Sequence, residues 1–355
     1  MHKWLLNGRA FFLAGFTIAL ASCTTAIPET NSTIIERDLK FAIADVRDMR
    51  AEFRNIFCSR LTIEVNCSNI LLHLPDEPIE DNYRLQSDVN SGAASMLPAR
   101  YRLAFVPGLF AGCIVPTILP FIDVVDKLRS DGFDARILSV EARASSEHNG
   151  DLIAQQLLTA NPDPRPWIIF GYSKGLPDIL EALIRNPTMG RNIAAVVSYA
   201  GAVGGSMLAD DTSNVAAHLL DYVPLPGCDI GDGSSIHSLR RDVRKLWWKV
   251  NHKRLNVQFF SLVATAQPHR VSLPLRNSFA KLSKFAPQND GQLVAEDAIV
   301  PGGALLGFIN ADHWAMAMPL SKQLPIAGAM FIDDLPRADL VMASIQVISL
   351  HTSHK

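Results

Sequence analysis

Apolar residues in the central part of the chain follow two alternating patterns. Short runs rich in β-branched residues are typical of buried strands, and stretches with apolar residues every three or four positions are typical of helices. These patterns predict strands at 102–106, 135–140, 167–170, 193–200, 257–264 and 304–309, with helices at 120–130, 152–159 and 176–186. Because strands that alternate with helices form parallel sheets covered on both faces, the pattern predicts an α/β fold with a mostly parallel central sheet.

The segment before residue 101 departs from this alternation. Apolar residues at helical spacing predict one long amphipathic helix from about residue 33 to Phe57. Residues 59–100 contain prolines and a glycine without periodicity, and we interpret them as a segment that wraps the main domain.

Residues 205–255 interrupt the alternation a second time. They lie between two predicted strands and are too long for a plain loop, so we interpret them as a helical cap over the functional site. Within this cap, basic residues surround an apolar helical stripe. The stripe consists of Leu239, Val243, Leu246, Trp247 and Val250. A solvated helix face is favoured over contact with anionic lipid headgroups.

The first 22 residues predict a secretory signal peptide. Lys3 and Arg9 precede an apolar run at 10–21 that is too short to span a bilayer comfortably. Small residues stand before Cys23, as in a bacterial lipobox, where the cysteine becomes the lipidated first residue of the mature chain. We expect lipidation at Cys23 rather than ordinary cleavage nearby, and Thr24 favours the outer membrane over the inner.

The chain of 355 residues therefore divides into a signal peptide at 1–22, a tether with an N-terminal helix and wrapping segment at 23–100, and a main domain at 101–355. We expect the mature protein in the bacterial cell envelope, on its periplasmic or surface face. The net charge of −2 gives no indication of nucleic-acid binding. Oligomeric state stays open.

Four cysteines remain after Cys23, and an exported protein meets conditions in which disulfides persist. Cys58 and Cys67 are close in sequence, so a disulfide between them is plausible, and Cys113 and Cys228 could make a second. Four cysteines allow three pairings, and the sequence does not choose between them.

The strongest chemical signal follows the predicted strand at 167–170. The motif Gly171-Tyr172-Ser173-Lys174-Gly175 stands between this strand and a predicted helix. Strand, tight turn and helix form the context that a nucleophile elbow requires. The alternative is a glycine-rich strand-to-helix loop without chemistry. We predict that Ser173 is the nucleophile.

A serine hydroxyl needs a base to remove its proton and an acid to orient that base. On this type of sheet the chain order is serine, acid, histidine. His313 follows the last predicted strand, where a loop can turn its imidazole toward the elbow. The first acidic residues after residue 264 are Asp290, Glu296 and Asp297. We predict Asp290 as the acid, with Asp297 as the alternative.

Negative charge that develops during acyl transfer needs hydrogen-bond donors. We predict the backbone N–H groups of Lys174 and Leu109 as this oxyanion hole, with Phe110 as the alternative to Leu109. We expect Lys174 to pair with Asp178 at the surface and not to act as the base. Asp312 is adjacent to His313 and is expected to be structural.

Residues 145–149, which include His148, follow a predicted strand and are expected to line the rim of the pocket. His148 precedes Ser173 in the chain, so we do not assign it the role of the base.

The elbow, the Pro107-Gly108 loop and the late Asp290–His313 order resemble the α/β-hydrolase superfamily of serine hydrolases, in particular bacterial lipases and esterases, over about residues 102–318. The resemblance implies hydrolysis of small-molecule or lipid esters through an acyl-enzyme, with no metal and no organic cofactor. The chain departs from many lipases in carrying Pro107 where they carry histidine, and in an acid far beyond the strand at 257–264. Two alternatives remain: a non-catalytic envelope protein that binds a lipid or a partner, and an acyltransferase.

Overall fold

The computed structural model describes residues 45–62, 65–77, 96–113, 118–160, 163–224, 227–324 and 327–352, all of which belong to one compact unit. The predicted signal peptide, Cys23, the tether and the first part of the predicted long helix lie outside these residues. No helix in the described part of the chain combines the length and apolar character needed to cross a bilayer.

An eight-stranded sheet forms the centre of the structure. Its order is β1-β8-β7-β6-β5-β3-β4, and the short strand β2 pairs with β8. All pairs are parallel except β2 with β8. The strands are β1 (Arg47–Asp48), β2 (Leu71–Leu72), β3 (Arg102–Val106), β4 (Asp134–Ile137), β5 (Trp167–Ser173), β6 (Ile193–Gly201), β7 (Gln258–Ala264) and β8 (Ala304–Ile309). The prediction of a mostly parallel sheet is confirmed.

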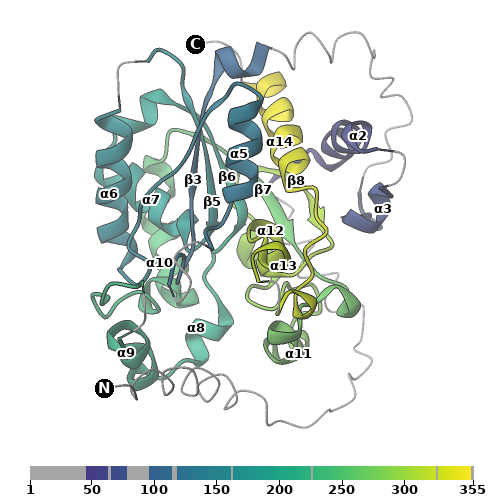
Figure 1. Ribbon diagram of the computed structural model, residues 1–355. Coiled ribbons are helices and arrows are strands. Elements are labelled where there is room, and N and C mark those ends of the chain that lie inside the picture. Colours follow the sequence, from purple (N-terminus) through teal and green to yellow (C-terminus); the bar gives the residue numbers. More distant parts are fainter. Residues whose placement is uncertain are drawn as a thin grey trace, which may run out of the picture. The chain divides into compact units, whose positions relative to one another are not determined.

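Helices cover both faces of this sheet (Figure 1). Alternate residues of β3 show the two layers, because Leu103 and Phe105 pack into one core while Ala104 and Val106 pack into the other. The first core also contains α2 (Arg50–Arg60), α5 (Ile122–Ser130) and α14 (Arg337–His351), and the second contains α6 (Ser146–Leu158) and α7 (Gly175–Arg185).

The remaining helices are short, and most lie in loops at the carboxyl ends of the strands or in the cap region. They are α3 (Cys67–Ile70), α8 (Met207–Asp211), α9 (Asn214–Tyr222), α10 (Arg241–Asn251), α11 (Arg276–Ser283), α12 (His313–Ala317) and α13 (Leu320–Gln323). The described part of residues 205–255 therefore contains three α-helices, α8 to α10.

The predicted long N-terminal helix is wrong over residues 45–49. Arg47 and Asp48 form β1 and pair with β8, and the helix begins only at Arg50. The helical spacing was nevertheless informative, because Met49, Phe53 and other apolar residues at that spacing are buried. Pairing with the edge of the sheet overrides the helical tendency in front of them. The wrapping segment is also more regular than expected, since it contains α3 and β2.

The apolar stripe predicted at 239–250 faces the core only in part, because Leu239 is buried and Trp247 packs against the second core. Leu246 and Val250 are each 64% exposed, whereas Arg244 is buried with its guanidinium over the ring of Trp247. The buried Arg244 guanidinium packs on the partly buried Trp247 in this orientation of the helix, and spacing alone could not show it.

The four described cysteines form two disulfides, Cys58–Cys67 and Cys113–Cys228. The first joins α2 to α3. The second joins the loop that follows β3 to the cap region, so the cap is covalently attached beside the predicted oxyanion loop.

Candidate active site

Ser173 lies at the carboxyl end of β5, immediately before α7, with a φ angle of 54°. A non-glycine residue in this left-handed region stores strain, which is common at functional sites. The flanking glycines allow the turn to pack closely. A Cβ on Gly175 would lie 2.3 Å from the carbonyl oxygen of Val106, and one on Gly171 would lie 2.7 Å from Cδ1 of Ile179.

The structure brings Asp290 and His313 together from two loops at this edge of the sheet. Nδ1 of His313 lies 2.6 Å from Oδ2 of Asp290, and both side chains are buried. The other carboxylate oxygen of Asp290 accepts hydrogen bonds from the backbone N–H groups of Gln292 at 2.8 Å and Leu293 at 2.7 Å. These bonds fix the carboxylate with Oδ2 facing the imidazole.

The backbone of His313 is held in addition to its ring. Its N–H donates to the carbonyl of Asp290 at 2.9 Å, and its carbonyl accepts from the hydroxyl of Tyr172 at 2.9 Å. The Tyr172 ring stacks on the imidazole with 4.9 Å between ring centroids. Burial raises the pKa of Tyr172 well above its ordinary value, so this hydroxyl remains a donor. Sequence reasoning missed this role, although Tyr172 stands inside the elbow motif.

Ser173 and His313 line the same cavity, which has a volume of about 350 Å³. Its other walls come from the loop after β3, from the cap, and from the segments after β6, around Asp290 and after α12. They are mostly apolar, with Leu109, Phe110, Ala202, Leu208, Ala209, Ile236, Leu239, Leu293 and Met318 among them. Besides Tyr172 and Ser173, the uncharged polar side chains in the described lining are Ser206, Thr212 and Gln292.

The loop after β3 approaches the serine closely. A Cβ on Gly108 would lie 2.7 Å from Cβ of Ser173, so only glycine fits there. The N–H of Phe110, the alternative oxyanion donor, already donates to the carbonyl of Ala142 at 3.0 Å. Leu109 and Phe110 both line the cavity, so it is this bond of the Phe110 N–H that favours Leu109 as the donor.

The other acidic candidates have different partners. Asp297 pairs with Arg241 of α10, with 2.8 Å between Nε and Oδ2. Asp312 accepts hydrogen bonds from the backbone of Ala315 and of Ser272, and so caps α12. Asp312 is thus structural, as expected, and Asp297 connects the cap to the loop before β8.

Two expectations about the surroundings are wrong. Lys174 and Asp178 do pair, at 2.7 Å, but each side chain is only 1% exposed because α6 packs over them and supplies Asn149 to the carboxylate. Residues 145–149 do not line the cavity: Ser145 caps α6, and His148 pairs with Glu141. In the described part of the chain, no cluster of histidine, cysteine, aspartate or glutamate could ligate a metal.

Neither a family model nor a curated protein sequence matches the chain. Solved structures that are similar to it include a carboxyl esterase and a lipase. A metagenomic carboxyl esterase is 29% identical, with a TM-score of 0.78 over 96% of this chain and 99% of the esterase. A mature lipase from Bacillus licheniformis is 24% identical, with a TM-score of 0.50 over 61% of this chain and 86% of the lipase, and this second likeness concerns the fold alone. The sheet and its helices form an α/β-hydrolase fold, as predicted from the sequence.

The buried Lys174–Asp178 pair gives a test of how the elbow helix is stabilised. Asp178→Leu leaves the Lys174 ammonium buried without its partner, so we expect a loss of about 3–5 kcal/mol in the free energy of unfolding. The double variant Lys174→Met with Asp178→Leu removes both charges and should lose less than Asp178→Leu alone. Urea unfolding of the two single variants and the double variant measures the coupling, and additive losses would contradict a coupled pair.

Asp297 predicts a pH dependence of stability. Burial raises the pKa of its carboxyl from 3.8 to about 7, against the opposing effect of Arg241. Between these two values the folded protein holds a proton that the unfolded chain has released, so stability falls as the pH rises from about 4 to about 7. Over this window the wild type should lose roughly 3 kcal/mol more than Asp297→Asn, measured by urea unfolding at each pH. Parallel pH profiles of the two proteins would refute this.

Proposed function

We propose that this protein is a serine hydrolase that cleaves carboxylic esters through an acyl-enzyme. The observation that carries the proposal is one cavity lined by Ser173, on a strained elbow, and by His313, which is hydrogen-bonded to Asp290. The similarity to a solved carboxyl esterase over nearly the whole chain supports it. The intact histidine–aspartate pair argues against a purely binding protein on the same fold.

In this mechanism Oγ of Ser173 attacks the ester carbonyl while Nε2 of His313 accepts the serine proton. Asp290 keeps the proton of the neutral imidazole on Nδ1 and stabilises the imidazolium that forms. The imidazolium then protonates the leaving alcohol. In the second half of the cycle a water molecule, deprotonated by His313, attacks the acyl-enzyme and releases the carboxylic acid and the free serine.

The oxyanion hole in this proposal consists of the N–H groups of Lys174 and Leu109. Gly108 supports it, because the absence of a side chain lets the loop backbone approach Ser173. One such donor stabilises the transition state by roughly 3 kcal/mol. The strained elbow supports the same geometry, since it fixes the N–H of the residue after the nucleophile.

The substrate we propose is an uncharged ester with an apolar acyl group. The cavity lining supports this, because apolar side chains dominate it and its polar members apart from His313 are neutral. Both small-molecule and lipid esters meet this description. Among the described lining residues, none apart from His313 offers a charge that would recognise an ionic substituent.

We further propose that Cys23 carries a lipid that anchors the enzyme in the bacterial cell envelope, at the outer membrane. The basic start, the short apolar run and the small residues before Cys23 support this. Several acyl chains on one residue would anchor the protein firmly, whereas a single chain binds only marginally.

The serine assignment is tested by labelling with a fluorophosphonate probe and by hydrolysis of p-nitrophenyl esters of increasing chain length. We expect labelling of the wild type and its loss in Ser173→Ala, because only an activated serine reacts with the probe. Asp290→Asn should lower kcat by roughly 10³–10⁴-fold through the wrong imidazole tautomer. Ser198→Ala is the control, since this buried serine lies on the neighbouring strand and donates to the carbonyl of Ala298. Persistent labelling of Ser173→Ala would overturn the assignment.

Lipidation is tested by feeding an alkyne-tagged fatty acid to expressing bacteria. The wild type should take up the tag and sediment with membranes, and Cys23→Ser should do neither, because it lacks the thiol that accepts the lipid. Equal tagging of both proteins would exclude Cys23 as the site.

A further inference from the structure

Residues 66–77, here named the N-terminal strap, run beside the strand that leads to the candidate base. Within the strap, Leu71 and Leu72 form β2 and pair antiparallel with Ile309 and Phe308 of β8. His313 follows the end of β8 by only four residues. A shift of the strap would therefore displace the start of the loop that carries the His313 imidazole.

Asn310, the first residue after β8, connects the strap to this loop. Its N–H donates to the carbonyl of Ile70 at 2.7 Å, and its Nδ2 donates to the carbonyl of Asn69 at 3.1 Å. Its side-chain amide also makes two hydrogen bonds with Gln267. Oδ1 accepts from the backbone N–H of Gln267 at 2.9 Å, and Nδ2 donates to Oε1 of the Gln267 side chain at 3.0 Å. The Asn310 side chain is buried, although its partners Asn69 and Gln267 lie at the surface.

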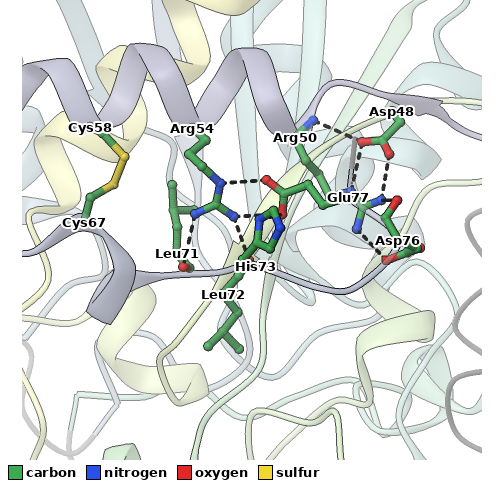
Figure 2. A network of polar contacts seen from close by, with 10 residues as sticks. All are labelled: Asp48, Arg50, Arg54, Cys58, Cys67, Leu71, Leu72, His73, Asp76 and Glu77. Carbon is green, nitrogen blue, oxygen red and sulfur yellow. Dashed lines mark hydrogen bonds and ion pairs between the residues drawn. A yellow bond between two sulfur atoms is a disulfide. The ribbon is translucent and has the colours of Figure 1, made fainter. Parts of the chain in front are cut away.

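The strap is itself fixed to helix α2, as Figure 2 shows. The Arg54 guanidinium donates to the carbonyls of Leu71 at 3.3 Å and Leu72 at 2.9 Å, and it forms two bonds with the carboxylate of Glu77 at 2.6 and 2.8 Å. The Cys58–Cys67 disulfide joins the same helix to the start of the strap. Arg54 thus holds β2 by its backbone, independently of the side chains of the strand.

A second arginine extends this attachment. Arg50 bonds to Asp48 of β1 and to Asp76 in the strap, so the strap and both short strands at the edge of β8 form one polar network (Figure 2). Burial of the Arg50 side chain makes the network costly to break, because its charge would remain without partners.

We propose that the N-terminal strap positions His313 through Asn310, which makes Asn310 a positioning residue of the active site. The role of the strap in catalysis rests on the proposed hydrolase function, whereas its control over the imidazole position does not. Reacting groups must be placed closely, and a displacement of about 1 Å can lower a rate about 100-fold. Asn310 transmits the position of the strap to the His313 loop, because its backbone and its side chain both bond to the strap.

Two variants test the proposal at different distances from the base. Asn310→Ala removes the side-chain bonds to Asn69 and Gln267, and Arg54→Met loosens the strap without touching the His313 loop. We expect kcat per active site, titrated with a fluorophosphonate, to fall about 100-fold in Asn310→Ala and about tenfold in Arg54→Met, with KM changed less than about twofold. Arg54→Lys, which keeps the charge opposite Glu77, should restore part of the loss.

Arg165→Met is the matched control. Arg165 has a side-chain exposure of 28%, against 21% for Arg54, and it likewise bonds to a carboxylate, Asp163, and to a backbone carbonyl, that of Pro98. It lies next to the start of β5, at the edge of the sheet away from Ser173. We expect its kcat to remain at the wild-type value even if its melting temperature falls as far as that of Arg54→Met.

A second readout does not require activity. In protein labelled with ¹⁵N-histidine, the Nδ1–H signal of His313, identified by its loss in His313→Gln, reports its hydrogen bond to Asp290. We expect this signal to shift or broaden in Asn310→Ala and Arg54→Met and to stay in place in Arg165→Met. An unchanged signal in both strap variants would overturn the proposal. Failure of the wild type to hydrolyse esters, with the signal responding as expected, would refute the proposed function and leave the strap assignment intact.

Discussion

The buried hydrogen bond between Asp290 and His313 is the interaction on which the account depends. A carboxylate placed away from water is costly unless its oxygens are fully bonded, and here one oxygen accepts two backbone N–H groups while the other meets the imidazole. The loop of Asp290 and the loop of His313 therefore cannot move separately. Tyr172 joins them to the elbow by donating to the His313 carbonyl, so that the proposed nucleophile and the proposed base share one support.

The sheet explains why residues far apart in the chain meet at this place. Ser173, Asp290 and His313 follow or precede strands whose carboxyl ends lie at one edge, where ligands of open α/β sheets bind. The surrounding structure limits the freedom of this edge. The Cys113–Cys228 disulfide joins the loop after β3 to the cap, and the N-terminal strap bonds to the loop after β8. The cap and the N-terminal strap both lie outside the central alternation of strands and helices. They are fixed to two loops near the active site, one after β3 and one after β8.

Much of this could be predicted from the sequence because its signals are local. A strand such as β5 and the elbow after it are encoded in consecutive residues, and the order of serine, acid and histidine narrowed the search to a few positions. Contacts between distant segments were harder to anticipate. Arg47 and Asp48 form a strand only because β8 offers an edge, and the buried guanidinium of Arg244 meets the Trp247 ring and the Val203 carbonyl. The positioning role of Asn310 likewise depends on a strap more than two hundred residues earlier in the chain.

The most direct measurement of the central claim is a crystal structure of the protein after inactivation by a phosphonate ester, whose tetrahedral phosphorus imitates the acyl-transfer intermediate. The account predicts phosphorus bonded to Oγ of Ser173 and the phosphoryl oxygen within hydrogen-bond distance of the N–H groups of Leu109 and Lys174. Nε2 of His313 should lie within about 3 Å of an ester oxygen or Oγ, with its Nδ1 still on Asp290. A phosphonate on another residue, or an imidazole turned away from the adduct, would contradict the account.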